Sequence, residues 1–272
     1  MAEAYRSIFF RVKENVHRLL QGSSLSKVLG EGYDFSELRP YEQGDDIRNI
    51  SWISSAKLGE PYVKRSYEER ELNVAVALLL DGRMVIGEKR ALYGDILATL
   101  GYSSLYSNHA TQIAFVLNKN SNISEPTKSV EVFETLLGEF SSFELLGTKV
   151  EYENVESELL ARVENRSLLF VVGDFLEEVD LSILAQKHEL YILIIRDKFE
   201  EYPKVSADVQ LVNPTNRRFI NQTLSKKALD YYVKRLATHD KKLYEHFREH
   251  NIHYVKIYDR DSIVEKIEEL FY

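Results

Sequence analysis

Short apolar runs alternate with segments of helical periodicity along the second part of the chain. The most apolar run, LNVAVALLL at 72–80, has the length of one strand and is bounded by charged residues. Continuous apolar runs are typical of strands that are covered on both faces. Further runs of this kind predict strands at 112–118, 167–173, 190–196 and 253–259. Helical spacing between them predicts helices at 92–105, 155–163, 181–187, 229–247 and 262–271.

This alternation of strands and helices predicts the fold class. Parallel strands need crossover connections, which are usually helices and are right-handed, so helices come to cover both faces of the sheet. The chain is therefore expected to form an α/β domain at 72–272, with a mostly parallel, Rossmann-like sheet and helices on both faces. Within it, 129–136 is interpreted as strand or mixed structure, and 207–223 as a β-hairpin that turns at Asn213-Pro214.

The first 71 residues have a different pattern. Apolar residues recur at helical spacing over 4–20, which predicts an amphipathic helix. The stretch that follows is polar and aromatic, has little helical period and contains several turn signals. Residues 1–71 are therefore expected to form an N-terminal helix and an irregular or β segment, both packed on the main domain.

Composition narrows the possible partners and sites. The 272-residue chain has a net charge of −8 and no concentrated basic stretch, which argues against nucleic acid as a partner. It has no cysteine, so disulfides, thiolate metal sites and a cysteine nucleophile are excluded. No apolar run approaches the ~20 residues that cross a bilayer, and the N-terminus lacks the apolar core of a signal peptide. We therefore expect a cytoplasmic protein that does not insert into a membrane.

Acidic residues follow several of the predicted strands. In open α/β sheets, the functional crevice lies at the carboxyl ends of the strands. Asp81 and Asp174 follow the two most apolar runs, which are expected to be central, so these two carboxylates should lie close together. Asp197 and Asp259 also follow strands, but we interpret them as helix caps, a position at which aspartate is favoured.

Common catalytic signatures are missing from the sequence. There is no Walker A motif and no G-x-S-x-G nucleophile elbow. Phosphatases of the haloacid dehalogenase type need a second aspartate two residues after the first, and Arg83 stands at that position. The stretch HFREH at 246–250 formally matches a zinc-peptidase signature, but we interpret it as a polar helix end.

An ordered set of acidic, aromatic and arginine residues precedes the first strand of the predicted sheet. Its members are Asp34, Phe35, Arg39, Tyr41, Gly44, Asp45, Asp46, Arg48, Trp52, Glu69 and Arg70. In this order and spacing, they resemble the signature of a bacterial family of von Willebrand A-like proteins associated with MoxR ATPases, a family of unknown function. The resemblance continues more weakly to the C-terminus.

The resemblance implies a von Willebrand A-type fold and a particular kind of site. In such domains, a metal-ion-dependent adhesion site holds Mg²⁺ at the carboxyl edge of the sheet, using Asp-x-Ser-x-Ser, a threonine and a second aspartate. By position, these ligands correspond to Asp81, Arg83, Val85, Thr148 and Asp174. Neither serine is present, so the resemblance implies a degenerate adhesion site.

Arg83 suggests what replaces the metal. Valine cannot coordinate a hard cation, and an arginine places a permanent positive charge near the metal position. Our hypothesis is that Arg83 bridges Asp81 and Asp174, and that the protein needs no metal or other cofactor. The alternative is that Arg83 points to solvent and that Asp81, Thr148 and Asp174 retain a weakly bound Mg²⁺.

The charged and aromatic residues of the signature allow two interpretations. They could form a surface that faces a partner, since Arg, Tyr and Trp dominate binding hot spots. They could instead form an internal network of ion pairs that attaches this segment to the sheet. The internal interpretation is favoured for Arg39, Asp45, Arg48 and Trp52, because cationic and acidic groups alternate over a few residues and a lone tryptophan is usually buried.

Two functions are compatible with these observations. The resemblance implies a non-catalytic adaptor that works with a MoxR-type AAA+ ATPase in the maturation or assembly of a client protein. The alternative is a metal-dependent hydrolase or phosphoryl-transfer enzyme, in which Asp81 and Asp174 would hold a divalent ion. The missing serines and the presence of Arg83 favour the adaptor, and therefore a protein that is not an enzyme.

Overall fold

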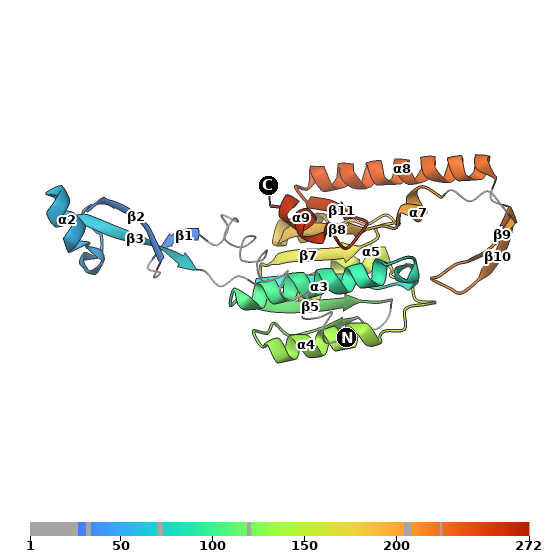
Figure 1. The fold of residues 1–272 in the computed structure, drawn as a ribbon, viewed down its shortest axis with the longest axis horizontal. Coiled ribbons are helices and arrows are strands. Elements are labelled where there is room, and N and C mark those ends of the chain that lie inside the picture. The colour runs from blue at the N-terminus through green and yellow to red at the C-terminus, as the bar shows by residue number, and fades with distance from the viewer. Residues whose placement is uncertain are drawn as a thin grey trace. The chain divides into compact units, whose positions relative to one another are not determined.

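The computed structural model describes residues 27–30, 34–69, 73–118, 121–203, 208–223 and 225–271. The chain has two compact units: the described residues up to 69 belong to a smaller one, and those from Asn73 onward belong to a larger one (Figure 1). The helix predicted at 4–20 lies outside the described residues. No helix in the described ranges is long and apolar enough to cross a membrane.

The smaller unit contains a three-stranded antiparallel sheet. Its strands are β1 (Lys27–Gly30), β2 (Asp34–Pro40) and β3 (Tyr62–Glu69), in the order β1-β3-β2. A 3-10 helix, η1 (Ile47–Asn49), and an α-helix, α2 (Trp52–Leu58), connect β2 to β3. The prediction of an irregular or β segment is therefore incomplete, because it omitted α2.

A left-handed glycine ends this short helix, and a side-chain hydrogen bond holds it. Gly59 has a φ of 82°, a left-handed conformation that glycine adopts without strain, and its N–H bonds to the carbonyl of Ser55. The hydroxyl of Ser55 accepts a hydrogen bond from Tyr62 N at 2.8 Å, which ties α2 to β3. No residue of α2 is buried, so the helix lacks the apolar stripe from which it could have been predicted.

A six-stranded sheet forms the centre of the larger unit. Its order is β11-β8-β7-β4-β5-β6, and all pairs are parallel except β5 with β6. The strands are β4 (Asn73–Leu79), β5 (Ala110–Val116), β6 (Asn122–Ile123), β7 (Leu168–Gly173), β8 (Glu189–Ile195) and β11 (His253–Ile257). All five predicted strands are present, and β4, β7 and β8 are almost completely buried, as their continuous apolar runs predict.

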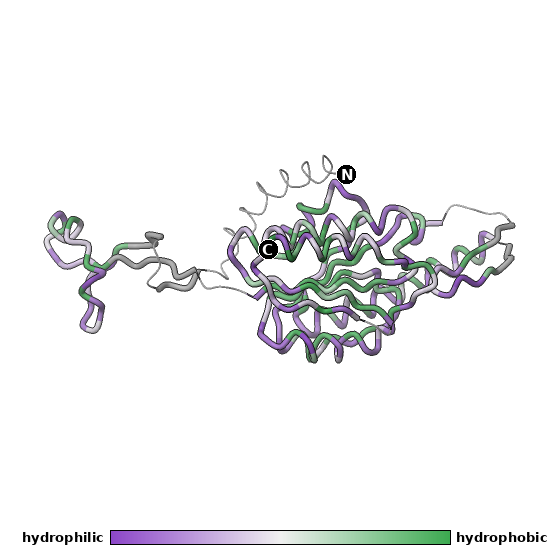
Figure 2. The backbone as a smooth tube through the Cα atoms, turned by 90° about the horizontal axis from the view of Figure 1, so that it is seen from below, coloured by the Kyte–Doolittle hydropathy of each residue, from purple (hydrophilic) through white to green (hydrophobic). Residues whose placement is uncertain are grey.

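Helices cover both faces of this sheet. Helices α5 (Tyr152–Arg162), α6 (Ser182–Lys187) and α8 (Lys226–Glu249) share a core with one face of the strands. Helices α3 (Lys89–Tyr106), α4 (Val130–Ser142) and α9 (Ile263–Glu269) pack on the other. Figure 2 shows the hydrophobic strands in the middle and hydrophilic segments outside them. The predicted fold class, an α/β fold with a mostly parallel sheet and helices on both faces, is confirmed.

The interpretation of 129–136 as strand or mixed structure is wrong, because this segment lies in α4. Ser129 caps the helix by accepting a hydrogen bond from Val132 N. Phe133, Leu137 and Phe140 form its buried face, at spacings of four and three residues. The β-branched residues at its start suggested a strand, but the apolar period over the whole segment is helical.

Three further elements of the described chain lie between β8 and α8. They are α7 (Lys198–Glu201) and the antiparallel pair β9 (Asp208–Val212) and β10 (Phe219–Thr223). The hairpin predicted at 207–223 is confirmed, and its turn contains Asn213-Pro214 as expected. Asp197 is the N-cap of α7, with a capping box that includes Glu200, and Asp259 accepts a hydrogen bond from Ser262 N just before α9.

Candidate functional site

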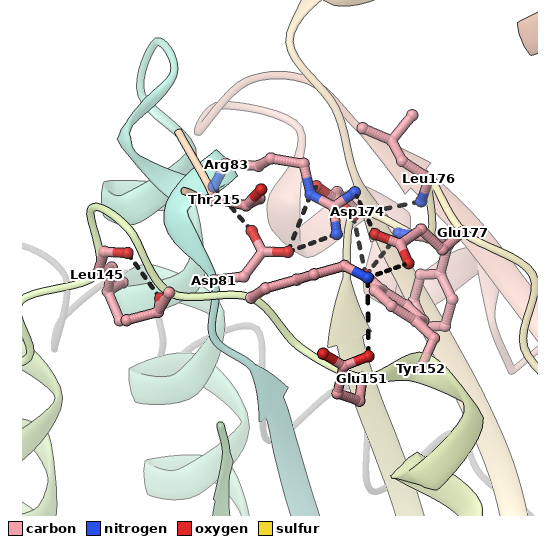
Figure 3. A network of polar contacts seen from close by, with 12 residues as sticks. Asp81, Arg83, Leu145, Glu151, Tyr152, Asp174, Leu176, Glu177 and Thr215 are labelled. Atoms are coloured by element: carbon pink, nitrogen blue, oxygen red, sulfur yellow. Dashed lines mark hydrogen bonds and ion pairs between the residues drawn. The ribbon is translucent and has the colours of Figure 1, made fainter. Parts of the chain in front are cut away.

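Two adjacent strands bring Asp81 and Asp174 to the same edge of the sheet. Strands β4 and β7 are parallel neighbours, with Leu78 opposite Val172, and both carboxylates come shortly after them at the carboxyl end. Asp81 is 2% exposed and Asp174 is 4% exposed. The strand order thus places two buried carboxylates together (Figure 3), an arrangement that requires a nearby cation or a shared proton.

The side chain of Arg83 lies between these carboxylates. A 3-10 helix, η2 (Gly82–Val85), starts at Asp81, whose Oδ1 accepts a hydrogen bond from Arg83 N at 2.7 Å. The tight turn lets the guanidinium fold back, with Nη2 at 2.5 Å and Nε at 2.9 Å from Asp81 Oδ2. The same Nε lies 3.0 Å from Asp174 Oδ2, and Nη1 lies 3.3 Å from Glu177 Oε1.

Further groups fix the second carboxylate. Tyr152 donates its hydroxyl hydrogen to Asp174 Oδ1 at 2.9 Å, and the backbone N–H of Leu176 points to the same oxygen at 3.3 Å. The ammonium of Lys89, 1% exposed, lies 3.7 Å from Asp174 Oδ2 and 2.7 Å from Glu200 Oε1. Asp174 is therefore held from several sides, and its orientation does not depend on Arg83 alone.

A second buried arginine supports the backbone beneath the site. Arg196 is completely buried and donates to the carbonyl oxygens of Asp174 at 2.5 Å and Phe175 at 3.1 Å. It also pairs with Asp240 of α8 at 3.0 Å. Phe175 has a φ of 47°, unusual for a residue with a side chain. Arg196 thus holds a strained turn that aims Asp174 at Arg83, and it connects that turn to α8.

Burial and mutual repulsion control the protonation of the cluster. Burial, together with the charge of Asp174, raises the pKa of Asp81 above its usual range, although its hydrogen bonds to Arg83 act in the opposite direction. Burial by itself would lower the pKa of Arg83, but the charges of Asp174 and Asp81 more than offset it, so the pKa is raised and the guanidinium stays charged. Burial and Asp174 raise the pKa of Tyr152 well above 10.0, which keeps its hydroxyl a donor.

The other two residues of the implied adhesion site lie differently. Thr148 donates its hydroxyl hydrogen to Leu145 O at 2.6 Å, and its own carbonyl accepts a hydrogen bond from Gly82 N. Val85 is 46% exposed and has no oxygen to offer. The structure therefore brings Asp81, Arg83 and Asp174 together but leaves Thr148 and Val85 outside the contact.

The donor set does not fit Mg²⁺. This ion requires about six oxygen ligands in octahedral geometry, whereas a guanidinium fills the space between the two carboxylates. Within the described part of the chain, no group of three or more His, Asp or Glu side chains is arranged to hold a metal ion. Arg83 instead compensates the negative charge of both carboxylates.

The turn of the β9–β10 hairpin packs beside this cluster. Pro214 O accepts a hydrogen bond from Gly147 N at 2.7 Å, and Arg217 donates to Leu146 O. A Cβ at Gly82 would lie 1.9 Å from Pro214 O, so only glycine permits this approach. The hairpin turn therefore holds the loop after β4 and the loop before α5 in place.

The signature residues of the smaller unit form local contacts. Arg39 pairs with Asp45 at 2.6 Å, and Arg48 pairs with Asp46 at 2.5 Å. The hydrogen bonds from Arg48 lower the pKa of Asp46 to about 2. The Arg48 side chain is nevertheless 83% exposed, and Trp52 is 68% exposed. The expectation of an internal network is thus wrong for Arg48 and Trp52, because the two-residue pairing of Arg48 with Asp46 needs no burial and α2 has no buried face.

Other signature residues are placed by the backbone. Asp34 and Phe35 belong to β2, where they pair with Tyr67 and Ser66 of β3, and Glu69 ends β3. Tyr41 donates its N–H to Pro61 O at 2.8 Å. Gly44 has a φ of 116°, which a residue with a side chain rarely adopts. Arg70 lies outside the described residues.

Sequence reasoning missed four residues that contact the cluster: Lys89, Tyr152, Glu177 and Arg196. Arg196 had a usable signal, since it ends the apolar run of β8 at the same edge of the sheet as Asp81. Lys89 and Tyr152 begin α3 and α5, and nothing in their local sequence separates them from ordinary surface residues.

One protein family matches most of the chain. Residues 37–242 match the family described as "Protein of unknown function DUF58". The chain is 25% identical, over 224 residues, to "Uncharacterized protein Rv1480" of Mycobacterium tuberculosis and to "Uncharacterized protein Mb1516" of Mycobacterium bovis, covering 78% of this chain and 70% of each relative.

Two solved structures show weak similarity. The conserved hypothetical protein BatB from Bacteroides thetaiotaomicron has a TM-score of 0.42 and 8% identity, covering 73% of this chain and 96% of that one. An aerotolerance-related membrane protein from Bacteroides fragilis has a TM-score of 0.39 and 12% identity, covering 74% and 98%.

Proposed function

On the premise that the chain belongs to the DUF58 family of proteins of unknown function, which its match over residues 37–242 shows, we propose that it is a non-catalytic interaction protein. It would be a cytoplasmic adaptor that works with a MoxR-type AAA+ ATPase on a client protein. In this arrangement the ATPase supplies the energy and the chain described here supplies recognition. The larger unit would be a von Willebrand A-like domain whose adhesion site is degenerate.

One observation carries the proposal: Arg83 compensates both buried carboxylates at the edge of the sheet. A guanidinium in that place removes the need for a metal ion and leaves neither carboxylate free to act as a nucleophile or base. A rigid sheet edge on which no catalytic group is free is better suited to binding a partner than to catalysing a reaction. The resemblance of the signature residues to the MoxR-associated family supports the choice of ATPase.

Co-purification tests the adaptor function. The full-length chain, tagged and expressed at its native level, is expected to retain a MoxR-type ATPase from native lysate, identified by mass spectrometry. The purified ATPase should then bind the purified chain in size-exclusion chromatography, with ATP or a non-hydrolysable analogue present. Failure of both the lysate capture and the reconstitution would contradict the proposal. The tag alone on an unrelated α/β protein is the control.

The alternative function remains a metal-dependent hydrolase or phosphoryl-transfer enzyme. The observation in its favour is the approach of Asp81 and Asp174, with Thr148 on an adjoining loop that bonds to Gly82. It requires Arg83 to leave the site. A phosphatase screen with added Mg²⁺ or Mn²⁺ separates the two functions: turnover abolished by Asp174→Ala would support the enzyme.

Calorimetry with Mg²⁺ tests the degenerate site directly. The wild-type chain is expected to give no binding heat, whereas Arg83→Ser/Val85→Ser should bind Mg²⁺, because it removes the guanidinium and supplies the two missing hydroxyls. Adding Asp174→Asn to that variant should abolish binding, and Arg83→Ala/Val85→Ala is the matched control without hydroxyls. Micromolar Mg²⁺ binding by the wild type, lost in Asp81→Ala, would instead support the metal site.

A further inference from the structure

Helix α8 is longer than the part of it that packs on the sheet. Its buried residues are Asp240, Leu243 and Phe247, all in the second half, and none of residues 226–239 is buried. Figure 1 shows that the N-terminal end of α8 extends past the ends of the strands, on the side of the β9–β10 hairpin. We call residues 226–239 the outer half of α8; it lies at the same edge of the sheet as Asp81.

The outer half carries an apolar stripe that is only partly covered. Leu229, Tyr232, Val233 and Leu236 follow the spacing i, i+3, i+4 and i+7 of one helical face. Further along the helix this face is buried in the core, but here Tyr232 is 40% exposed. Tyr231, two residues from both Leu229 and Val233, lies on the opposite, outward face of the helix and is 63% exposed. A partly open apolar stripe that includes an exposed tyrosine is typical of binding surfaces.

The charge of the outer half is opposite to that of the whole chain. Lys226, Lys227, Lys234 and Arg235 are exposed, against a single acid, Asp230, whereas the chain carries −8. None of the three lysines forms an ion pair with a residue in the described ranges. Arg235 lies 5.9 Å from the ring centre of Tyr231. Because these lysines have no acidic partner in the described ranges, they are available to compensate negative charge on another molecule.

We propose that the outer half of α8 binds an acidic segment of a partner protein that also carries apolar side chains. The stripe would receive the apolar side chains, and Lys226 and Arg235, which flank it on the helix, would meet the carboxylates. Lys227 and Lys234 lie on the outward face and would add longer-range attraction, which steers association. This inference rests on the proposed adaptor function and adds to it the binding surface and the chemistry of the partner.

The charge of the chain also argues against a membrane or a nucleic acid as the partner of the outer half of α8. A membrane or a nucleic acid would meet the whole edge of an acidic molecule, and Asp230 lies within the basic patch itself. Both partners need a wide basic face. A short protein segment contacts only the helix, so local charge complementarity is sufficient for it.

Fluorescence anisotropy tests the inference with a defined probe. The probe is a labelled synthetic peptide of about 16 residues, in which Glu and Asp alternate with Leu and Phe at helical spacing. The full-length chain is expected to bind it, more weakly as salt is raised. Lys234→Glu/Arg235→Glu should weaken binding about tenfold or more. The matched control is Lys241→Glu/Lys242→Glu, the same change in charge on the same helix two turns further on, and it should bind like wild type.

The outcomes separate this inference from the adaptor function. If the wild type does not bind the peptide, or if both double variants bind equally, the inference is overturned even where the ATPase co-purifies. If peptide binding follows the charge of the outer half but no AAA+ ATPase is recovered, the surface stands and the choice of ATPase fails. Stronger binding to phosphatidylserine vesicles or to duplex DNA, lost in Lys234→Glu/Arg235→Glu, would overturn the assignment to a protein segment. Circular dichroism confirms that each variant is folded.

Discussion

Replacing Arg83 by alanine is expected to lower the free energy of unfolding of the larger unit by about 3–5 kcal/mol, the usual cost of breaking a buried ion pair by removing one partner. The Arg83 side chain is 12% exposed, and those of Asp81 and Asp174 are 3% and 5% exposed. Without the guanidinium, Asp174 keeps Lys89 at 3.7 Å, but Asp81 loses its cation. The measurement is chemical denaturation followed by far-UV circular dichroism.

The stability loss of Arg83→Ala should depend on pH. The folded-state pKa of Asp81 is raised by burial and by Asp174. A group whose pKa is higher in the folded state than in the unfolded state contributes stability that is fully present below its unfolded-state pKa. This stability is lost as the pH rises through the folded-state pKa. Because Arg83 limits the rise in the pKa of Asp81, removing Arg83 should raise that pKa further. The deficit relative to wild type is therefore expected to be smaller at about pH 5 than at about pH 7.5.

Two further variants make this result interpretable. Lys266→Ala removes a cation that pairs with Glu269 at 2.6 Å but is 32% exposed, and it should cost less than about 1 kcal/mol. Asp81→Asn added to Arg83→Ala should recover part of the loss, since it removes the buried charge. An Arg83→Ala variant as stable as wild type would show that the guanidinium does not compensate these carboxylates.

Arg196→Ala is expected to cost a similar amount, about 3–5 kcal/mol, because it leaves a buried carbonyl without a donor and removes a large buried side chain. The side chain is completely buried and donates to two backbone carbonyls and to Asp240. Its removal leaves the carbonyl of Asp174 without this donor, whereas Phe175 O keeps a contact with the ring of His239 at 2.8 Å. Asp240 keeps Lys256 at 2.9 Å, so the carbonyls and the lost packing should account for much of the effect.

Arg196→Lys distinguishes charge from geometry. Lysine retains a positive charge near Asp240 but cannot supply the planar set of donors that reaches both carbonyls. We therefore expect it to recover less than half of the loss in Arg196→Ala, measured by denaturation under the same conditions. Full recovery by lysine would mean that the charge alone matters and that Arg196 does not hold the turn at Phe175. Because the single tryptophan, Trp52, lies in the smaller unit, its fluorescence reports on that unit separately.

The sequence predicts the sheet of this protein better than its helices. Strands β4, β7 and β8 are buried on both faces, and burial of that kind leaves a continuous apolar run that is easily recognised. The helical face of α4 is visible only over the whole length from Val130 to Ser142, because β-branched residues dominate its first turn. Helix α2 has no buried face at all, so periodicity has nothing to detect there.

The site is predictable to the extent that it depends on strand ends. Asp81 and Asp174 follow adjacent parallel strands, and Arg83 is near both because a single tight turn separates it from Asp81. The sequence predicts this contact, and the structure has it. That the cluster descends from an adhesion site stays a prediction. Tyr152 reaches the cluster from a segment far along the chain, through packing that no local spacing records, whereas Arg196 is indicated by its place at the end of β8.

The order of the sheet bears on how the chain can acquire its structure during synthesis. Strand β4 is made first and occupies an interior position, with β5 and β6 on one side of it and β7, β8 and β11 on the other. Each later strand pairs with a strand that is at the edge of the sheet when the new strand is made. None has to insert between two strands that are already paired. Domains begin to fold from the N-terminal side as the chain is made. A nascent chain of this protein can thus build its sheet outward as it emerges from the ribosome, and the last strand to join, β11, takes an outermost position.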